Sequence, residues 1–161
     1  MNDSIHYFAY GSNMSTRRLA ARVTDIRPVG SGVLLGHELR FHKRGRDGSG
    51  KCDAFRVSRD DARVIGVLFT LPRESKVELD HIEGLGAGYG QKTVSVITPE
   101  GSHTEAMTYY ATDFADELLP YCWYRHHVLV GAREFDLPAD YVRTVASVPF
   151  TRDRDPERRA R

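Results

Sequence analysis

Glu83 is the acidic residue best placed in this sequence to move a proton. It follows a segment with helical spacing, residues 73–82, and stands directly before a glycine-rich run at 84–90. The dipole at the C-terminal end of a helix disfavours a negative charge, and burial of a carboxyl group there raises its pKa. Such a group suits general acid/base catalysis. A surface glutamate at a fraying helix end fits the same pattern, so both interpretations stay open at this point.

A second candidate site lies near the N-terminus, where a short apolar run meets a glycine turn. It consists of Tyr7, Phe8, Ala9, Tyr10, Gly11, Ser12 and Asn13. The pattern predicts a strand, a tight turn and a helix over residues 14–22, with Gly11 in a conformation that other residues resist and Ser12 or Asn13 as N-cap. Unpaired N–H groups at a helix start attract a phosphate or a carboxylate. An ordinary structural turn has the same composition.

Metal ligation finds little support in the spacing of the histidines. His126 and His127 are adjacent on an expected helix and point about 100° apart, whereas His37 and His42 lie on opposite faces of an expected strand. We therefore predict no metal site.

Nucleophilic catalysis by a hydroxyl or a thiol is a weaker alternative. Cys122 lies one helical turn before His126, although a small cysteine filling the core is the more common arrangement. Ser12 lacks the Gly-x-Ser-x-Gly elbow. An amide hydrolase or acyl transferase that uses Ser12 or Cys122 remains an alternative function.

Strands and helices alternate along the chain and must position these residues. Beyond the opening strand, further strands are expected over residues 33–43, 53–58, 63–71, 91–98 and 103–111, and helices over 73–82, 121–134 and 139–148. The basic, glycine-rich segment 44–51 reads as a mobile surface loop. The short connections predict an α+β fold with a mostly antiparallel sheet, curled or closed into a small β-barrel and flanked by helices.

Length and composition favour one domain with a small-molecule partner. The chain has 161 residues and a formal net charge of +1, which argues against a broad nucleic-acid or membrane surface. We expect a single domain over residues 1–150 and a charged, disordered tail over 151–161. Two cysteines without paired spacing and the lack of a signal-peptide pattern predict a cytoplasmic protein. The sequence gives no prediction of oligomeric state.

Three blocks of sequence, in the same order, resemble the γ-glutamylcyclotransferase family (AIG2-like). The first is Tyr-Phe-Ala-Tyr-Gly-Ser-Asn-Met at 7–14, and the second is Leu-Asp-His-Ile-Glu-Gly at 79–84, followed by Gly88 and Tyr89. The third runs from Tyr109 through Tyr124 and Gly-Ala-Arg-Glu at 131–134 to Leu-Pro-Ala-Asp-Tyr at 137–141. Together they span nearly the whole chain up to about residue 145.

The resemblance implies an enzyme without a cofactor that cyclises a γ-glutamyl amide to 5-oxoproline and releases an amine or amino acid. It implies that Glu83 is the general acid/base. It also implies that a small-molecule γ-glutamyl substrate is bound by the turn from Tyr7 to Ser12, by the backbone of Asn13 and by the side chain of Tyr124. Family members often have Gly-x-Tyr where Tyr89 here directly follows Gly88, so the role of Tyr89 stays open.

Two questions remain open from the sequence alone. A non-catalytic module that senses a γ-glutamyl metabolite would use the same pocket, although retention of Glu83 argues against it. The leaving group is also not fixed, and the basic residues of segment 44–51 point only weakly to an acidic one.

Overall fold

The computed structural model describes residues 3–160 and consists of short strands and helices. The strands are β1 Ser4–Ala9, β2 Arg27–Leu35, β3 His37–Arg44, β4 Gly50–Arg56, β5 Arg63–Pro72, β6 Tyr89–Ile97 and β7 His103–Ala111. The helices are η1 Ser12–Met14, α1 Thr16–Ala20, η2 Arg73–Ser75, α2 Lys76–Glu83, α3 Cys122–Glu134, α4 Ala139–Ala146 and α5 Pro156–Arg159. None of these helices is long and apolar enough to cross a membrane, within the residues described.

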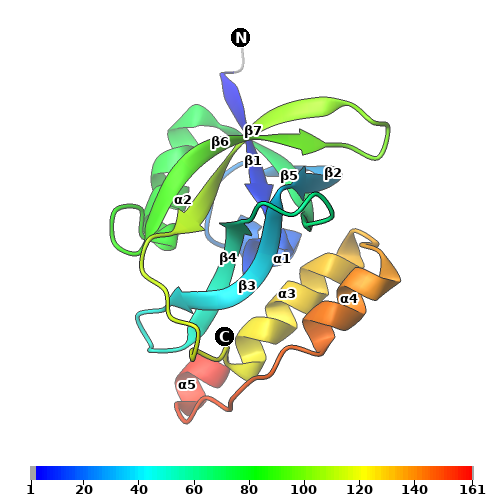
Figure 1. Ribbon diagram of the computed structural model, residues 1–161. Coiled ribbons are helices and arrows are strands. Elements are labelled where there is room, and N and C mark those ends of the chain that lie inside the picture. Colours follow the sequence, from blue (N-terminus) through cyan, green and yellow to red (C-terminus); the bar gives the residue numbers. More distant parts are fainter. Residues whose placement is uncertain (1–2, 161) are drawn as a thin grey trace.

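A closed barrel forms the centre of the fold. Its strand order is β1-β5-β2-β6-β7, and its pairs are antiparallel except for the parallel contact between β1 and β7. Apolar side chains are buried on both faces of its strands, among them Phe8, Val64, Val67, Phe69 and Val96. The β3–β4 hairpin lies below the barrel, with α3 and α4 along one side (Figure 1). The predicted α+β fold with a small, mostly antiparallel barrel is confirmed.

The expected strand over 33–43 is wrong, because the chain turns within it. Gly36 has a φ of 73° and ends β2, so that β2 stays in the barrel and β3 leaves it to pair with β4. The segment expected as a loop, 44–51, closes this hairpin, and the Gly45 N–H donates to the Ser49 carbonyl at 2.8 Å. The loose alternation of apolar and polar residues over 33–43 gave no sign of the turn at Gly36, where the glycine adopts a left-handed conformation.

The helix expected over 14–22 is shorter than predicted, because α1 begins two residues later and ends two residues earlier. Ser15 is its N-cap, and the Ser15 hydroxyl accepts from the Arg18 N–H at 3.4 Å. Ser12 and Asn13 instead belong to the 3₁₀ turn η1. Their side chains are therefore not used as caps of α1.

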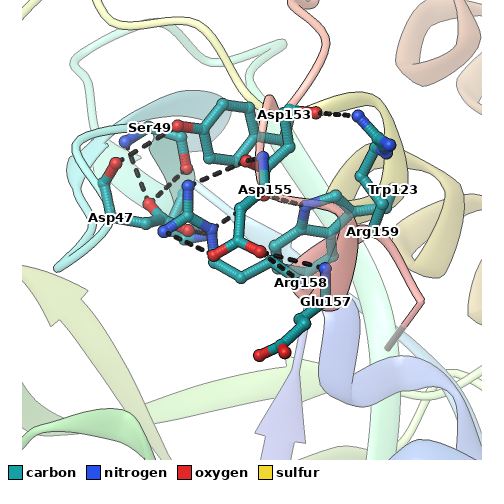
Figure 2. A network of polar contacts seen from close by, with 10 residues as sticks. Asp47, Ser49, Trp123, Asp153, Asp155, Glu157, Arg158 and Arg159 are labelled. Carbon is teal, nitrogen blue, oxygen red and sulfur yellow. Dashed lines mark hydrogen bonds and ion pairs between the residues drawn. The ribbon is translucent and has the colours of Figure 1, made fainter.

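The C-terminal segment, residues 151–160, differs from the solvated tail that its composition favours. Asp153 is only 1% exposed and accepts hydrogen bonds from the Trp123 indole at 2.9 Å and from the Arg158 guanidinium at 2.9 and 2.8 Å. Figure 2 shows this network beside the β3–β4 turn. A buried carboxylate with several donors thus fixes the segment against the start of α3.

Candidate active site

One pocket of about 590 Å³ collects most of the residues singled out from the sequence. It lies where the end of β1, η1, the end of α2, the β3–β4 turn and the start of α3 meet. The predicted residues on its wall are Tyr7, Tyr10, Gly11, Ser12, Asn13, Glu83, Tyr89 and Tyr124. The two sequence blocks around residues 7–13 and 79–84 therefore face one cavity.

Phe8 and Ala9 do not line this pocket, in contrast to the expectation that the whole turn contacts substrate. Both side chains are fully buried, at 0% and 1% exposure. The Phe8 carbonyl accepts a hydrogen bond from the Thr108 hydroxyl at 2.8 Å. These two residues anchor β1 inside the barrel.

Glu83 is the last residue of α2 and faces the pocket. Gly84 ends the helix with a φ of 71°, a C-terminal conformation that glycine adopts readily. The Glu83 side chain is half-buried, and removal of water around its carboxyl group raises its pKa above the ordinary 4.5. Arg22, Lys43 and Arg18 act in the opposite direction without cancelling this effect.

Asn13 holds the Glu83 carboxyl group in place. Its amide nitrogen donates to Glu83 Oε1 and also to the Tyr7 hydroxyl, the latter at 3.2 Å. Its amide oxygen faces the Arg22 guanidinium at 3.5 Å. One amide with two N–H groups thus connects the carboxylate to the Tyr7 phenol.

Gly11 is required for a different reason from the one that the sequence indicated. Its φ is −116°, which other residues also adopt. A side chain there would instead meet its neighbours, because an added Cβ lies 3.0 Å from Cys52 Cβ and 3.3 Å from the Tyr124 hydroxyl. The left-handed conformation that favours glycine is not used at Gly11, and close packing explains the glycine.

Two tyrosine hydroxyls clamp the backbone of Cys52 on the pocket wall. The Cys52 N–H donates to the Tyr124 hydroxyl at 3.0 Å, and the Tyr89 hydroxyl donates to the Cys52 carbonyl at 2.6 Å. These bonds join β4 to α3 and to β6. They give Tyr89 a structural contact that its shifted position in the sequence left open.

The thiol and hydroxyl alternatives find no activating partner in the described part of the pocket. Cys122 is exposed and not on the pocket wall, so its assignment to the core was wrong. Burial raises the pKa of the Cys52 thiol to about 12, which disfavours a thiolate. Ser12 lines the pocket, and no histidine does among the residues described.

No three His, Cys, Asp or Glu side chains of residues 3–160 cluster to hold a metal ion.

Most of the basic side chains on the pocket wall were not predicted as site residues from the sequence. They are Arg18, Arg22, Lys43, Arg46, Lys51 and Arg158. Arg18 and Arg22 are four residues apart, a helical spacing that could have placed them on one face. Lys43 and Arg158 come from segments for which the sequence predicts no site, whereas Arg46 and Lys51 belong to segment 44–51, whose basic residues point weakly to an acidic leaving group. The Lys51 ammonium lies 4.7 Å and 4.6 Å from the Trp123 and Tyr124 ring centres.

Comparison with known proteins points to one group. The chain is 28% identical over 152 residues to the γ-glutamylcyclotransferase of Bos taurus, covering 91% of this chain and 79% of that protein. It is 29% identical over 145 residues to the enzyme of the same name from Homo sapiens, with 86% and 76% covered. A solved structure named γ-glutamyl cyclotransferase superposes with a TM-score of 0.87 at 25% identity, over 94% of this chain and 92% of that one.

The chain is thus γ-glutamylcyclotransferase-like in both sequence and fold. A sequence model described as the AIG2-like family matches residues 63–145, which is more than half of the chain. This protein belongs to the AIG2-like family.

Proposed function

We propose that the protein is a γ-glutamylcyclotransferase that converts a γ-glutamyl amide to 5-oxoproline and releases an amine or amino acid. The observation that carries the proposal is the pairing of Glu83 with Asn13 in a pocket that also holds the turn at residues 7–13. The likeness to proteins named γ-glutamylcyclotransferase supports it. The two free cysteines also agree with a cytoplasmic location, which forms part of the proposal.

The reaction needs one group that takes and returns a proton. The substrate α-ammonium becomes nucleophilic when it gives a proton to the Glu83 carboxylate. Its nitrogen then bonds to the γ-carbonyl carbon. As the amide C–N bond breaks, Glu83 passes this proton to the leaving nitrogen. The attacking nitrogen gives up a second proton as it becomes the ring amide, and the Glu83 carboxylate transfers that proton to the leaving nitrogen as well, so the products are 5-oxoproline and a protonated amine. A raised pKa brings Glu83 closer to the pH at which both transfers proceed. The protein otherwise has to hold the γ-glutamyl chain folded on itself.

The turn after β1 supplies the groups that would hold the γ-glutamyl portion. The N–H groups at the start of η1 have no intrahelical acceptor, and Ser12 and Asn13, to which they belong, both line the pocket. They would bind the substrate α-carboxylate or the oxyanion that forms on the γ-carbonyl oxygen. Tyr124, held by the Cys52 N–H at 3.0 Å, completes this wall.

Asn13 is assigned to positioning. It binds the carboxyl group of Glu83 and the phenol of Tyr7 together, so the carboxylate keeps one orientation while its charge changes. A hydrogen bond to the charged form lowers the pKa of Glu83, opposing the effect of burial.

The direct experiment is chromatography of products from a panel of γ-glutamyl compounds with amino acid, peptide and amine leaving groups. We expect 5-oxoproline and the free leaving group in equal amounts. Binding of panel members without any 5-oxoproline would favour a non-catalytic sensing module. Release of glutamate in place of 5-oxoproline would point to an amide hydrolase.

A further inference from the structure

The pocket carries more positive than negative charge. Six cationic side chains line it against two acidic ones, Asp47 and Glu83, within the described chain. The whole protein has a net charge of only +1. The excess is therefore local to the cavity and concerns whatever the cavity binds.

Two of the cations already have acidic partners. The Lys51 ammonium lies 3.0 Å from Asp47 Oδ2, and the Arg158 guanidinium pairs with Asp153 at 2.8 Å and with Asp155 at 3.6 Å. These charges are compensated inside the protein. They leave little attraction for a ligand anion.

Lys43 and Arg46 differ from that pair. Neither side chain forms an ion pair or a hydrogen bond with any residue in the described part of the chain. Lys43 is only 7% exposed, and its ammonium lies 4.4 Å from the centre of the Tyr89 ring. Loss of water lowers the pKa of Lys43. The Lys43 ammonium is not among the fully buried polar atoms without a partner in the described residues, and the Glu83 carboxylate attracts it from beyond hydrogen-bond distance. A ligand carboxylate would give this ammonium the direct acceptor that the described residues do not provide.

The two cations lie together beside the segment that follows Glu83. A Cβ added to Gly88 would lie 3.0 Å from Lys43 Nζ, and one added to Gly84 would lie 3.8 Å from Arg46 Nη2. Arg22, in contrast, lies beside Asn13 on the side of the turn after β1. The pocket thus has one cationic region beside Asn13 and a second one beside the residues that follow Glu83.

Two positive groups in the second region exceed what a simple leaving amino acid requires. Its α-carboxylate compensates one of them. We propose that Lys43 and Arg46 form a subsite for a leaving amino acid with a second carboxylate in its side chain, so that the preferred substrates are γ-glutamyl derivatives of dicarboxylic amino acids. This inference rests on the proposed function.

The test compares γ-glutamyl-glutamate with γ-glutamyl-glutamine, which differ only by a carboxylate and an amide. At low salt we expect kcat/KM to favour γ-glutamyl-glutamate by about tenfold or more, as for one hydrogen-bonded charge pair. The preference should fall as salt is added. Lys43→Met and Arg46→Gln should each lose more activity on the acidic compound than on the neutral one.

Arg44→Gln is the matched control. Arg44 is the neighbour of Lys43 in the sequence but pairs with Asp113 and does not line the pocket. Its substitution should leave the preference unchanged. Lys43→Arg keeps the charge and should retain most of the preference, which separates loss of charge from loss of packing. Thermal melting of each variant checks folding.

Binding is measured in parallel by calorimetry on the Glu83→Gln protein, so that the inference does not depend on turnover. Equal affinity of this protein for the two compounds, or a preference that survives both Lys43→Met and Arg46→Gln, would overturn the subsite and leave the proposed function standing. Preferential binding of γ-glutamyl-glutamate without 5-oxoproline from the parent would support the subsite and refute the proposed function.

Discussion

The two sides of the pocket are built in different ways. On the inner side, Tyr7, Asn13 and Glu83 come from β1, η1 and α2 and are joined by hydrogen bonds through one amide. On the outer side, cations from the β3–β4 turn and the C-terminal segment lie over aromatic rings, as Lys51 does over Trp123. The inner side has the fixed geometry that the proposed proton transfer needs. On the outer side, the positive charge of Lys43 and Arg46 forms the proposed subsite for the leaving group.

Glu83→Gln, on the inner side of the pocket, should cause the largest loss of activity. Glutamine keeps the shape of the side chain but cannot accept the ammonium proton. General acid/base groups typically contribute a factor of about 10² to 10⁴, so we expect 5-oxoproline formation to fall at least about a hundredfold on every γ-glutamyl compound that the parent uses. A comparable rate in the variant would remove Glu83 from its assigned role.

The same substitution should leave the fold stable. Because the folded pKa of Glu83 is raised, the folded protein binds more protons than the unfolded chain in the window from about 4.5 up to that raised value, and stability falls as pH rises through it. Glu83→Gln removes this pH-dependent loss of stability, and it also removes a negative charge from the C-terminal end of a helix. Thermal melting at pH 7 should show a change between zero and about 1 kcal/mol of stabilisation.

Asn13→Ala tests whether the inner side depends on positioning. A hydrogen bond to a charged group contributes about 1.5–3 kcal/mol, which predicts a loss of about tenfold to a hundredfold in kcat with a smaller change in KM. Thr16→Ala is the control, because Thr16 bonds Glu134 and does not line the pocket. An effect confined to KM would make Asn13 a substrate-binding residue without a role in orienting Glu83.

Tyr124→Phe should have a smaller effect. The substitution removes the acceptor of the Cys52 N–H and a proposed hydrogen bond to the substrate. Each of these two hydrogen bonds contributes about 0.5–1.5 kcal/mol. Steady-state kinetics should show a modest loss. An unchanged rate would reduce Tyr124 to packing, and a loss above about a thousandfold would assign it a part in proton transfer.

Asp153→Asn addresses the outer side and should have the smallest effect on turnover. The pKa of Asp153 lies below its ordinary range, and the largest cause is hydrogen bonding from Arg158. The stability that this ionised carboxylate contributes is present above the unfolded pKa and is lost as pH falls through the lower folded value. We expect a rise in KM of a few-fold at most with kcat retained, because Trp123 and Arg158 lose their anchor. A fall in kcat instead would connect this segment to the chemistry.

The inner side was largely predictable from the sequence. Glu83 precedes a glycine that ends α2, and Asn13 follows a short strand, so local patterns and the family resemblance both lead to them. The bond between Asn13 and Glu83 was not predictable, because it joins residues 70 positions apart. The sequence pattern predicts Ser12 or Asn13 as the helix N-cap, a role that the structure gives to Ser15.

The outer side was not predictable, because it depends on long-range packing. Lys43 belongs to a strand that leaves the barrel after Gly36, and a register shift between Arg40 and Lys43 alters its direction. Arg158 lies in a segment whose composition is typical of disorder. The contact of Asp153 with Trp123 on α3 and the backbone hydrogen bonds of Thr151 with Pro120 and Cys122 explain why that segment is ordered.

The pH dependence of kcat/KM tests the central claim, that the partly desolvated Glu83 carboxylate takes the proton. Activity requires the ionised form, so it should be lost as pH falls through the pKa of Glu83, with a midpoint above 4.5. Asn13→Ala should move this midpoint upward, because the Asn13 hydrogen bond stabilises the ionised form. A midpoint at or below 4.5, or one that stays in place in Asn13→Ala, would contradict the account.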